Sequence, residues 1–283
     1  MKKLLKRLVI FFIGLPVLLS LVVFFPHYNH LLLNLVVIAF SVLGALEFRN
    51  ILSCKNLIIS LPETVILGVI SPAAWTLVVS FGVTRHIASI FFILGASWIL
   101  VSRIIKCRGE FDLYVGRTAA GFAVIIYPGL FMTWIVRMAA FSEADIVILV
   151  FLLVAILNDA LAWAVGMLFG KNNRGFFAAS PNKSIAGFIG GLAASLFTGI
   201  AAAMYFPGAF VPILIPSLPA GALLGLATGA AAILGDLSES ALKRSAGVKD
   251  SGTLIMGRGG ALDTIDSLAM AAPVFHIIYQ VLF

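Results

Sequence analysis

Charged residues are scarce in this sequence: Asp, Glu, Lys and Arg make up only 11% of its 283 residues. Soluble globular domains average about 25% charged residues, so the composition excludes a soluble enzyme, a disordered chain and a coiled coil. Two cysteines are too few for a disulfide framework. What the sequence has in abundance is apolar residues, 61% of the total. This indicates a polytopic membrane protein.

Apolar runs follow one another along the whole chain. Lipid offers the backbone no hydrogen-bond partner, so each run that spans the bilayer should be a helix. We therefore predict an all-α, polytopic integral membrane protein with about nine transmembrane helices. The first run follows a basic segment and lacks a small-residue cleavage site behind it, which favours a retained helix over a signal peptide. We expect kinks at Pro16, Pro128 and Pro216. The runs cover residues 8–25, 31–46, 63–82, 86–105, 117–138, 144–169, 185–206, 210–235 and 266–283.

The basic residues predict an orientation. If the N-terminus is cytoplasmic and the runs alternate, all of the 19 Lys and Arg residues except Arg85 and Arg137 fall on the cytoplasmic side. This is a strong positive-inside bias, and it places the C-terminus outside. We expect N-terminal transmembrane helices over residues 1–115. A C-terminal transmembrane region that carries the chemistry should follow over residues 116–283, with cytoplasmic loops at 170–184 and 236–266.

The second cytoplasmic loop concentrates charge. It holds five of the 12 acidic residues, and if the preceding helix continues into it, four polar residues share one face at spacings of three and four: Asp236, Glu239, Ser240 and Lys243. Carboxylates are ligands for Mg²⁺, which usually shares its shell with substrate phosphates. Basic side chains neutralise phosphate oxygens, and glycines let the backbone approach them. The mixture indicates metal-assisted chemistry on a phosphorylated substrate.

Each of these features also has a simpler explanation. Lys243 and Arg244 could anchor the topology, Glu239 and Lys243 could form an ordinary i,i+4 pair, and Asp263 could cap the last helix. Taken together within one loop, they favour a functional site.

Two features outside this loop are similarly open. Loop 170–184 could be a basic turn in which Ser180 or Asn182 caps the next helix. Asp159 lies inside an apolar run, where a carboxylate is costly. It is either a functional group or a hydrogen-bonding partner of a neighbouring helix.

Residues 240–266, SALKRSAGVKDSGTLIMGRGGALDTID, resemble the C-terminal signature of the phosphatidate cytidylyltransferases, also called CDP-diacylglycerol synthases. Residues 180–191, SPNKSIAGFIGG, resemble a second conserved segment of that family, and Asp159 with Ala162 and Trp163 resembles a third. The first 115 residues match only as generic membrane helices. The family usually has Glu, Pro or Gly, His, a larger aliphatic residue and Arg, in that order, at the positions of Ala186, Met256, Arg258, Ala261 and Thr264.

The resemblance implies an enzyme that transfers the cytidylyl group of CTP to phosphatidic acid, forming CDP-diacylglycerol and pyrophosphate. It implies an active site at the cytoplasmic face of a bacterial inner membrane. The expected partners are CTP, phosphatidic acid, membrane lipid and a second copy of the chain in a homodimer, and we expect no nucleic acid.

The resemblance also implies roles for residues. Mg²⁺, as one or two divalent ions or beside a second, different cation, would be held by Asp236, Asp263 and Asp266. Asp236 closes one predicted helix, and the other two open the next antiparallel one, so all three should reach the same side. The remaining catalytic residues would be Lys243, Arg244, Lys249 and Asp250. Substrate binding would involve Asp159, Ser180, Asn182, Lys183, Arg258, Gly259 and Gly260.

Two other functions stay open. CTP-dependent lipid-alcohol kinases such as polyprenol kinases carry a related C-terminal pattern, but they transfer the γ-phosphoryl group and release CDP. A transporter or non-catalytic scaffold is the alternative of another class. A transporter should show internal repeats and several polar residues at mid-membrane depth, whereas Asp159 is nearly alone there.

The charge pattern yields a first testable prediction. In a variant without native cysteines, Asn29→Cys and Lys249→Cys should react with a membrane-impermeant thiol reagent from opposite sides of the membrane, because an odd number of spans separates them. Labelling of both positions from one side would contradict the predicted topology.

Overall fold

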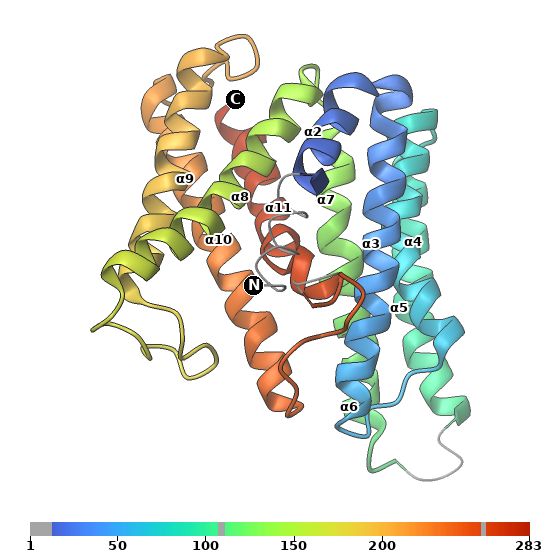
Figure 1. The fold of residues 1–283 in the computed structure, drawn as a ribbon. Helices are drawn as coiled ribbons and strands as arrows, with labels where there is room; N and C mark the ends of the chain where they lie inside the picture. Colours follow the sequence, from blue (N-terminus) through green and yellow to red (C-terminus); the bar gives the residue numbers. More distant parts are fainter. Residues whose placement is uncertain (1–12, 107–110, 256–258) are drawn as a thin grey trace. The chain divides into compact units, whose positions relative to one another are not determined.

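The computed structural model describes residues 13–106, 111–255 and 259–283, and within these ranges every regular element is a helix (Figure 1). Eight helices of this part of the chain are long and apolar enough to cross a membrane. The prediction of an all-α, polytopic membrane protein is therefore confirmed. The elements are α2 (Leu15–Phe24), α3 (His27–Ser53), α4 (Leu61–Phe81), α5 (His86–Lys106), α6 (Tyr114–Val124), the π-helical η2 (Ile125–Leu130), α7 (Phe131–Met138), α8 (Ala144–Phe169), α9 (Ile185–Tyr205), α10 (Ser217–Ser245) and α11 (Leu262–Leu282).

The three predicted kinks have different outcomes. Pro128 lies within η2, where the helix departs from α geometry. The hydroxyl of Ser41 lies 2.5 Å from the Pro128 carbonyl oxygen and donates a hydrogen bond to it. The kink at Pro216 is wrong: α10 begins at the next residue, and the Pro216 carbonyl accepts from Ala220 N at 3.1 Å. Pro16 stands in the first turn of α2, where proline fits. The first part of the predicted 8–25 run lies outside the described residues.

The chain divides into two compact units. The first comprises Met1–Ala140 with Ser245–Ile265, and the second comprises Phe141–Arg244 with Asp266–Phe283. The first unit contains α2 to α7, and the second contains α8, α9 and nearly all of α10. Helix α11 begins in the first unit and continues in the second.

Charged side chains inside the first unit have protein partners. Arg103 of α5 and Glu63 of α4 form a two-pronged ion pair of 2.9 and 3.1 Å, and both side chains are almost fully buried. The Arg137 guanidinium lies 4.5 Å from the ring centre of Trp75 and 3.9 Å from that of Trp134. Such pairing offsets the cost of placing charge among apolar helices.

The second unit is held together by small residues and one polar network. A Cβ added at Gly199 of α9 would lie 2.1 Å from the Gly221 carbonyl oxygen of α10, so the two backbones touch. Asn158 of α8 is fully buried and donates to Ser195 Oγ at 2.8 Å and to Gly229 O at 3.3 Å. Close glycine contacts and interhelical hydrogen bonds are the usual means of packing helices in lipid, where the hydrophobic effect does not drive association.

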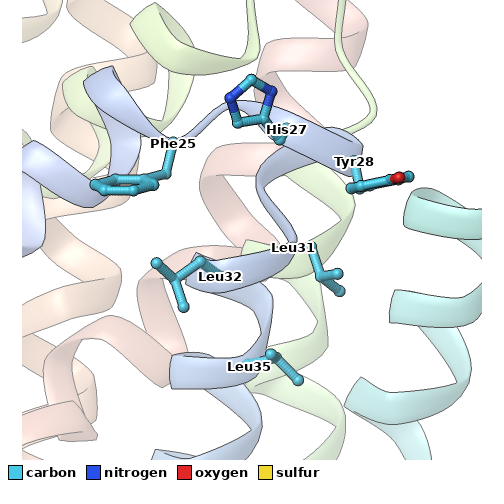
Figure 2. Close-up of a pocket in the computed structure, with 6 residues that line it drawn as sticks. All are labelled: Phe25, His27, Tyr28, Leu31, Leu32 and Leu35. Atoms are coloured by element: carbon cyan, nitrogen blue, oxygen red, sulfur yellow. The ribbon is translucent and has the colours of Figure 1, made fainter.

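An apolar pocket opens beside α3 in the first unit (Figure 2). Only two of its lining side chains, those of His27 and Tyr28, carry polar atoms. The pocket has no carboxylate, lysine or arginine, and it does not suit a nucleotide triphosphate. Its lining residues are Phe25, His27, Tyr28, Leu31, Leu32 and Leu35.

The contact between α9 and α10 yields a second prediction. Gly199→Val should lower the free energy of unfolding by about 1–3 kcal/mol, because the new side chain overpacks a backbone contact. Gly208→Val is the matched control, since a Cβ at Gly208 meets nothing within 4 Å. Thermal unfolding of purified protein in detergent measures both. Equal unfolding temperatures for the two variants would contradict the tight contact.

Candidate active site

Helix α10 extends well beyond the apolar run that predicted it and ends at Ser245. The first turns of the predicted 236–266 loop are therefore helical, as Figure 1 shows for the lower part of α10. This extension places Asp236, Glu239 and Lys243 on one helix face. Glu239 is fully buried and forms an ion pair with Lys243. The expected i,i+4 pair is thus present, and it lies inside the protein rather than on a solvated face.

Lys183 meets this face from the other loop of the second unit. Its ammonium donates to the Asp236 carboxylate and forms an ion pair with it. The turn that presents it is fixed by Lys183 N, which donates to Ser180 O at 3.1 Å. Ser184 then caps α9 by accepting from Gly187 N at 3.1 Å. The cap is therefore Ser184 rather than Ser180 or Asn182, the two residues that the sequence offered for that role.

Further carboxylates act on Lys183. Burial lowers the pKa of the Lys183 ammonium below its usual range, and the negative charges of Asp266 and Asp159 oppose that shift. Asp159 is half-buried, and its charge also interacts with that of Asp266. Asp159 thus belongs to a charged cluster of the second unit rather than standing alone among apolar residues.

Helices α10 and α11 approach closely at this cluster. A Cβ added at Gly235 would lie 2.4 Å from the backbone oxygen of Asp266, so glycine is needed where the two helices meet. Asp236 follows Gly235 directly, and Asp266 is 8% exposed. The negative charges of Glu239 and Asp159 both act on Asp266 there. Carboxylates gathered in this way, with lysines among them, suit a divalent cation and a polyphosphate.

A second group of predicted residues lies in the first unit. Asp263, in the first turn of α11, uses Oδ2 to accept from Gly260 N at 2.7 Å and from Ser251 N at 3.0 Å, and Oδ2 also lies 2.9 Å from Ser251 Oγ. Gly259 has φ +115°, and a Cβ there would lie 2.4 Å from Asp263 Oδ2. Asp263 therefore organises the segment before α11, which is more than the simple helix cap considered from the sequence.

Most of the other predicted site residues have side chains that are exposed to solvent. Four side chains are exposed, those of Asn182, Arg244, Lys249 and Asp250, and that of Ser180 is half-buried. Ile255 and Gly259 exchange backbone hydrogen bonds of 2.8 and 3.1 Å and form an isolated antiparallel bridge. Arg258 and Met256 lie outside the described residues.

One buried carboxylate of this region was missed by sequence analysis. Glu47 of α3 is 9% exposed and accepts from Ala261 N at 2.9 Å, from Leu262 N at 2.8 Å and from Ser251 Oγ at 2.8 Å. Its sequence signal is weak, because it stands just after an apolar run and beside Arg49, where it looks like an ordinary membrane-boundary charge.

The metal site remains a prediction. Across residues 13–106, 111–255 and 259–283, no three His, Cys, Asp or Glu residues are already arranged as a metal-binding group. The predicted ligands Asp236 and Asp266 belong to the second unit, and Asp263 belongs to the first.

Fold and site together define a polytopic membrane protein with a mixed carboxylate and lysine cluster suited to phosphate chemistry. A model of the Cytidylyltransferase family matches residues 5–282, and this chain belongs to that family. The chain is 42% identical over 130 residues to a phosphatidate cytidylyltransferase of Synechocystis sp., covering 44% of this chain and 42% of that protein. It is 40% identical over 121 residues to one of Haemophilus influenzae, covering 43% and 41%. It is 30% identical over 155 residues to one of Aquifex aeolicus, covering 55% and 54%. The chain spans about half the length of the curated relatives it matches.

The Lys183 contact yields a third prediction. Lys183→Met leaves Asp236 without its ammonium partner, and the free energy of unfolding should fall by about 1–3 kcal/mol. Added Mg²⁺ should raise the unfolding temperature of this variant more than that of the wild type, because a bound cation replaces the lost charge. Lys171→Met, on an exposed residue of the same loop, is the control and should match the wild type. A Mg²⁺ response that is equal in all three proteins would contradict a cation-binding cluster.

Proposed function

We propose that this protein is a phosphatidate cytidylyltransferase. A phosphate oxygen of phosphatidic acid attacks the α-phosphorus of CTP and forms a new P–O bond. The bond between the α-phosphorus and the oxygen bridging to the β-phosphorus breaks, and pyrophosphate leaves with the electron pair. The lipid product is CDP-diacylglycerol. Membership of the Cytidylyltransferase family supports this reaction, as does the similarity to phosphatidate cytidylyltransferases of other bacteria.

The observation that carries the proposal is the Lys183–Asp236 pair and its surroundings. Transfer between phosphates needs positioning and neutralisation of negative charge more than covalent chemistry. Lys183 and Lys243 supply positive charge for the phosphates of CTP or of the lipid. The loop that presents Lys183 and the extension of α10 both emerge from membrane-spanning helices. A lipid headgroup can therefore reach them while its acyl chains stay in the bilayer.

The carboxylates fit a magnesium ion. Asp236 and Asp266 stand on either side of the close contact at Gly235. We propose both as ligands, together with Asp263, which precedes Asp266 by one helical turn on α11. When bound, Mg²⁺ would neutralise phosphate oxygens of CTP and polarise the α-phosphorus. Lys249, Arg244 and Arg258 remain candidates for phosphate binding, and Asp250 remains the candidate that orients them.

Product analysis tests the proposal. Purified protein, Mg²⁺, phosphatidic acid and CTP labelled in the cytosine ring should give a labelled lipid and one equivalent of pyrophosphate. Release of labelled CDP together with phosphorylation of an added polyprenol would identify a lipid-alcohol kinase instead. No consumption of CTP with either lipid would favour a transporter or scaffold.

A fourth prediction concerns Asp263. Asp263→Asn should reduce turnover by at least about 10²-fold, because the charge for the cation is lost. The asparagine oxygen can still accept from Ser251 N and Gly260 N, so the segment should stay folded. Asp145→Asn, on an exposed residue of α8, is the control. Near wild-type turnover of Asp263→Asn with Mg²⁺ would contradict its role as a ligand.

A further inference from the structure

Glu47 connects the N-terminal helices to the segment that carries Asp250, Gly259, Gly260 and Asp263. Resting on the function proposed above, we infer that Glu47 is a positioning residue for nucleotidyl transfer, which holds residues 250–255 and 259–263 in the shape that the reaction requires. Glu47 and all the contacts that carry this inference belong to the first unit.

The carboxylate of Glu47 performs the capping of α11 from another helix. The first N–H groups of a helix have no intrahelical acceptor. Here Glu47 Oε1 accepts from Ala261 N at 2.9 Å, and Oε2 accepts from Leu262 N at 2.8 Å. Ala261 and Leu262 are fully buried, so water cannot replace these two bonds. A negative group is also favoured at a helix N-terminus by the helix dipole.

Ser251 relays this anchoring to Asp263. Its hydroxyl lies 2.8 Å from Glu47 Oε2 and 2.9 Å from Asp263 Oδ2. Ser251 N also donates to Asp263 Oδ2, at 3.0 Å. A shift of Glu47 therefore moves Ser251, and a shift of Ser251 moves the acceptor that holds Asp263. Glu47 acts on the proposed metal ligand through this one intermediate.

At two positions the Glu47 carboxylate leaves room only for glycine. A Cβ added at Gly252 would lie 2.3 Å from Glu47 Oε1, and one at Gly260 would lie 2.0 Å from Oε2. Neither glycine has a positive φ. Both glycines are therefore needed for space and not for backbone conformation. One turn before Glu47, a Cβ at Gly44 would lie 3.0 Å from Ile265 of α11, so the same face of α3 docks against the start of α11.

In the part of the chain that the structure describes, the Glu47 carboxylate contacts groups just before and at the start of α11, and not a basic side chain of another membrane helix. Glu63, the other buried acid of the first unit's spans, pairs with Arg103 and thereby joins two membrane helices. The donors to Glu47 that the described residues provide are two backbone N–H groups and one hydroxyl, all within 251–262. Because the two acids differ in what they hold, their variants can separate positioning from general stability.

The experiment compares Glu47→Gln with Glu63→Gln in full-length purified protein. Glutamine keeps the size of glutamate, but it turns an NH₂ donor toward groups that are already donors. Glu47→Gln should lower turnover at least tenfold, raise the Mg²⁺ concentration for half-maximal rate and leave the KM for phosphatidic acid within twofold. Hydrogen exchange of the peptide covering 251–262 should become faster. Glu63→Gln should lower the unfolding temperature, while its Mg²⁺ dependence and exchange at 251–262 match the wild type.

Gly252→Ala is the second variant, and it tests the same contact from the loop side if Glu47→Gln does not fold. Alone it should raise exchange at 251–262 and the Mg²⁺ requirement. In a Glu47→Ala background it should add no further change, because the added methyl group then has room.

The outcomes separate the two proposals. A wild type that makes no CDP-diacylglycerol, with exchange still raised by Glu47→Gln, would overturn the proposed function and leave the anchoring by Glu47 standing. An active wild type in which Glu47→Gln and Glu63→Gln have equal Mg²⁺ dependence and equal exchange would overturn the positioning role. Additive effects of Gly252→Ala and Glu47→Ala would overturn it as well.

Discussion

Hydrocarbon neither donates nor accepts a hydrogen bond, so every polar group that these helices carry among apolar residues needs a partner from the protein. The partners differ with the task. Arg103 and Glu63 neutralise each other between two helices. Asn158 joins α8 to Ser195 of α9 and to the backbone of α10. Glu47 satisfies the start of α11. The pairing requirement thus determines which helices must touch, and it brings the charged residues of the candidate site to defined places.

In the candidate site the charged groups also lie close to one another, but carboxylates outnumber the lysines that could neutralise them. In the second unit, Asp159 and Glu239 act on Asp266, and all three acids act on Lys183. Two lysines do not neutralise so many carboxylates, and a divalent cation would supply the missing positive charge. Local backbone structure makes this cluster possible. The turn before the Ser184 cap presents Lys183, and the extension of α10 presents Asp236.

Much of this was accessible from the sequence. Apolar runs predicted the membrane helices, because length and composition alone decide whether a segment can span lipid. The spacing of Asp236, Glu239 and Lys243 predicted a shared helix face, and the ion pair of Glu239 with Lys243 lies on it. Helix ends were less accessible. The 31–46 run continues as a helix to Ser53, since polar residues that hydropathy excludes can still be helical when the protein satisfies them. At the other end α3 begins at His27, but Tyr28, Asn29 and His30 have positive φ and interrupt the helical backbone.

What sequence analysis missed depends on contacts between distant residues. Pro216 looked like an interior proline because apolar residues flank it, whereas the helix begins at the next residue. Ser184 caps α9 because residues 180–183 form a turn, so the helix begins only after that turn. The local sequence signal of Glu47 is weak. Its partners are 204 to 215 residues away, so no periodicity or spacing within a window could connect them.

That separation has a consequence for biosynthesis. Glu47 is synthesised 204 residues before Ser251 and 215 before Leu262. At about 5–20 residues per second, the nascent chain spends roughly 10–40 s with α3 made and the donors to its carboxylate still absent. During that interval the acid must stay hydrated at the membrane surface or be shielded by the insertion machinery. The first unit therefore completes its assembly only after residues 141–244 of the second unit have been translated, although most of its helices leave the ribosome first.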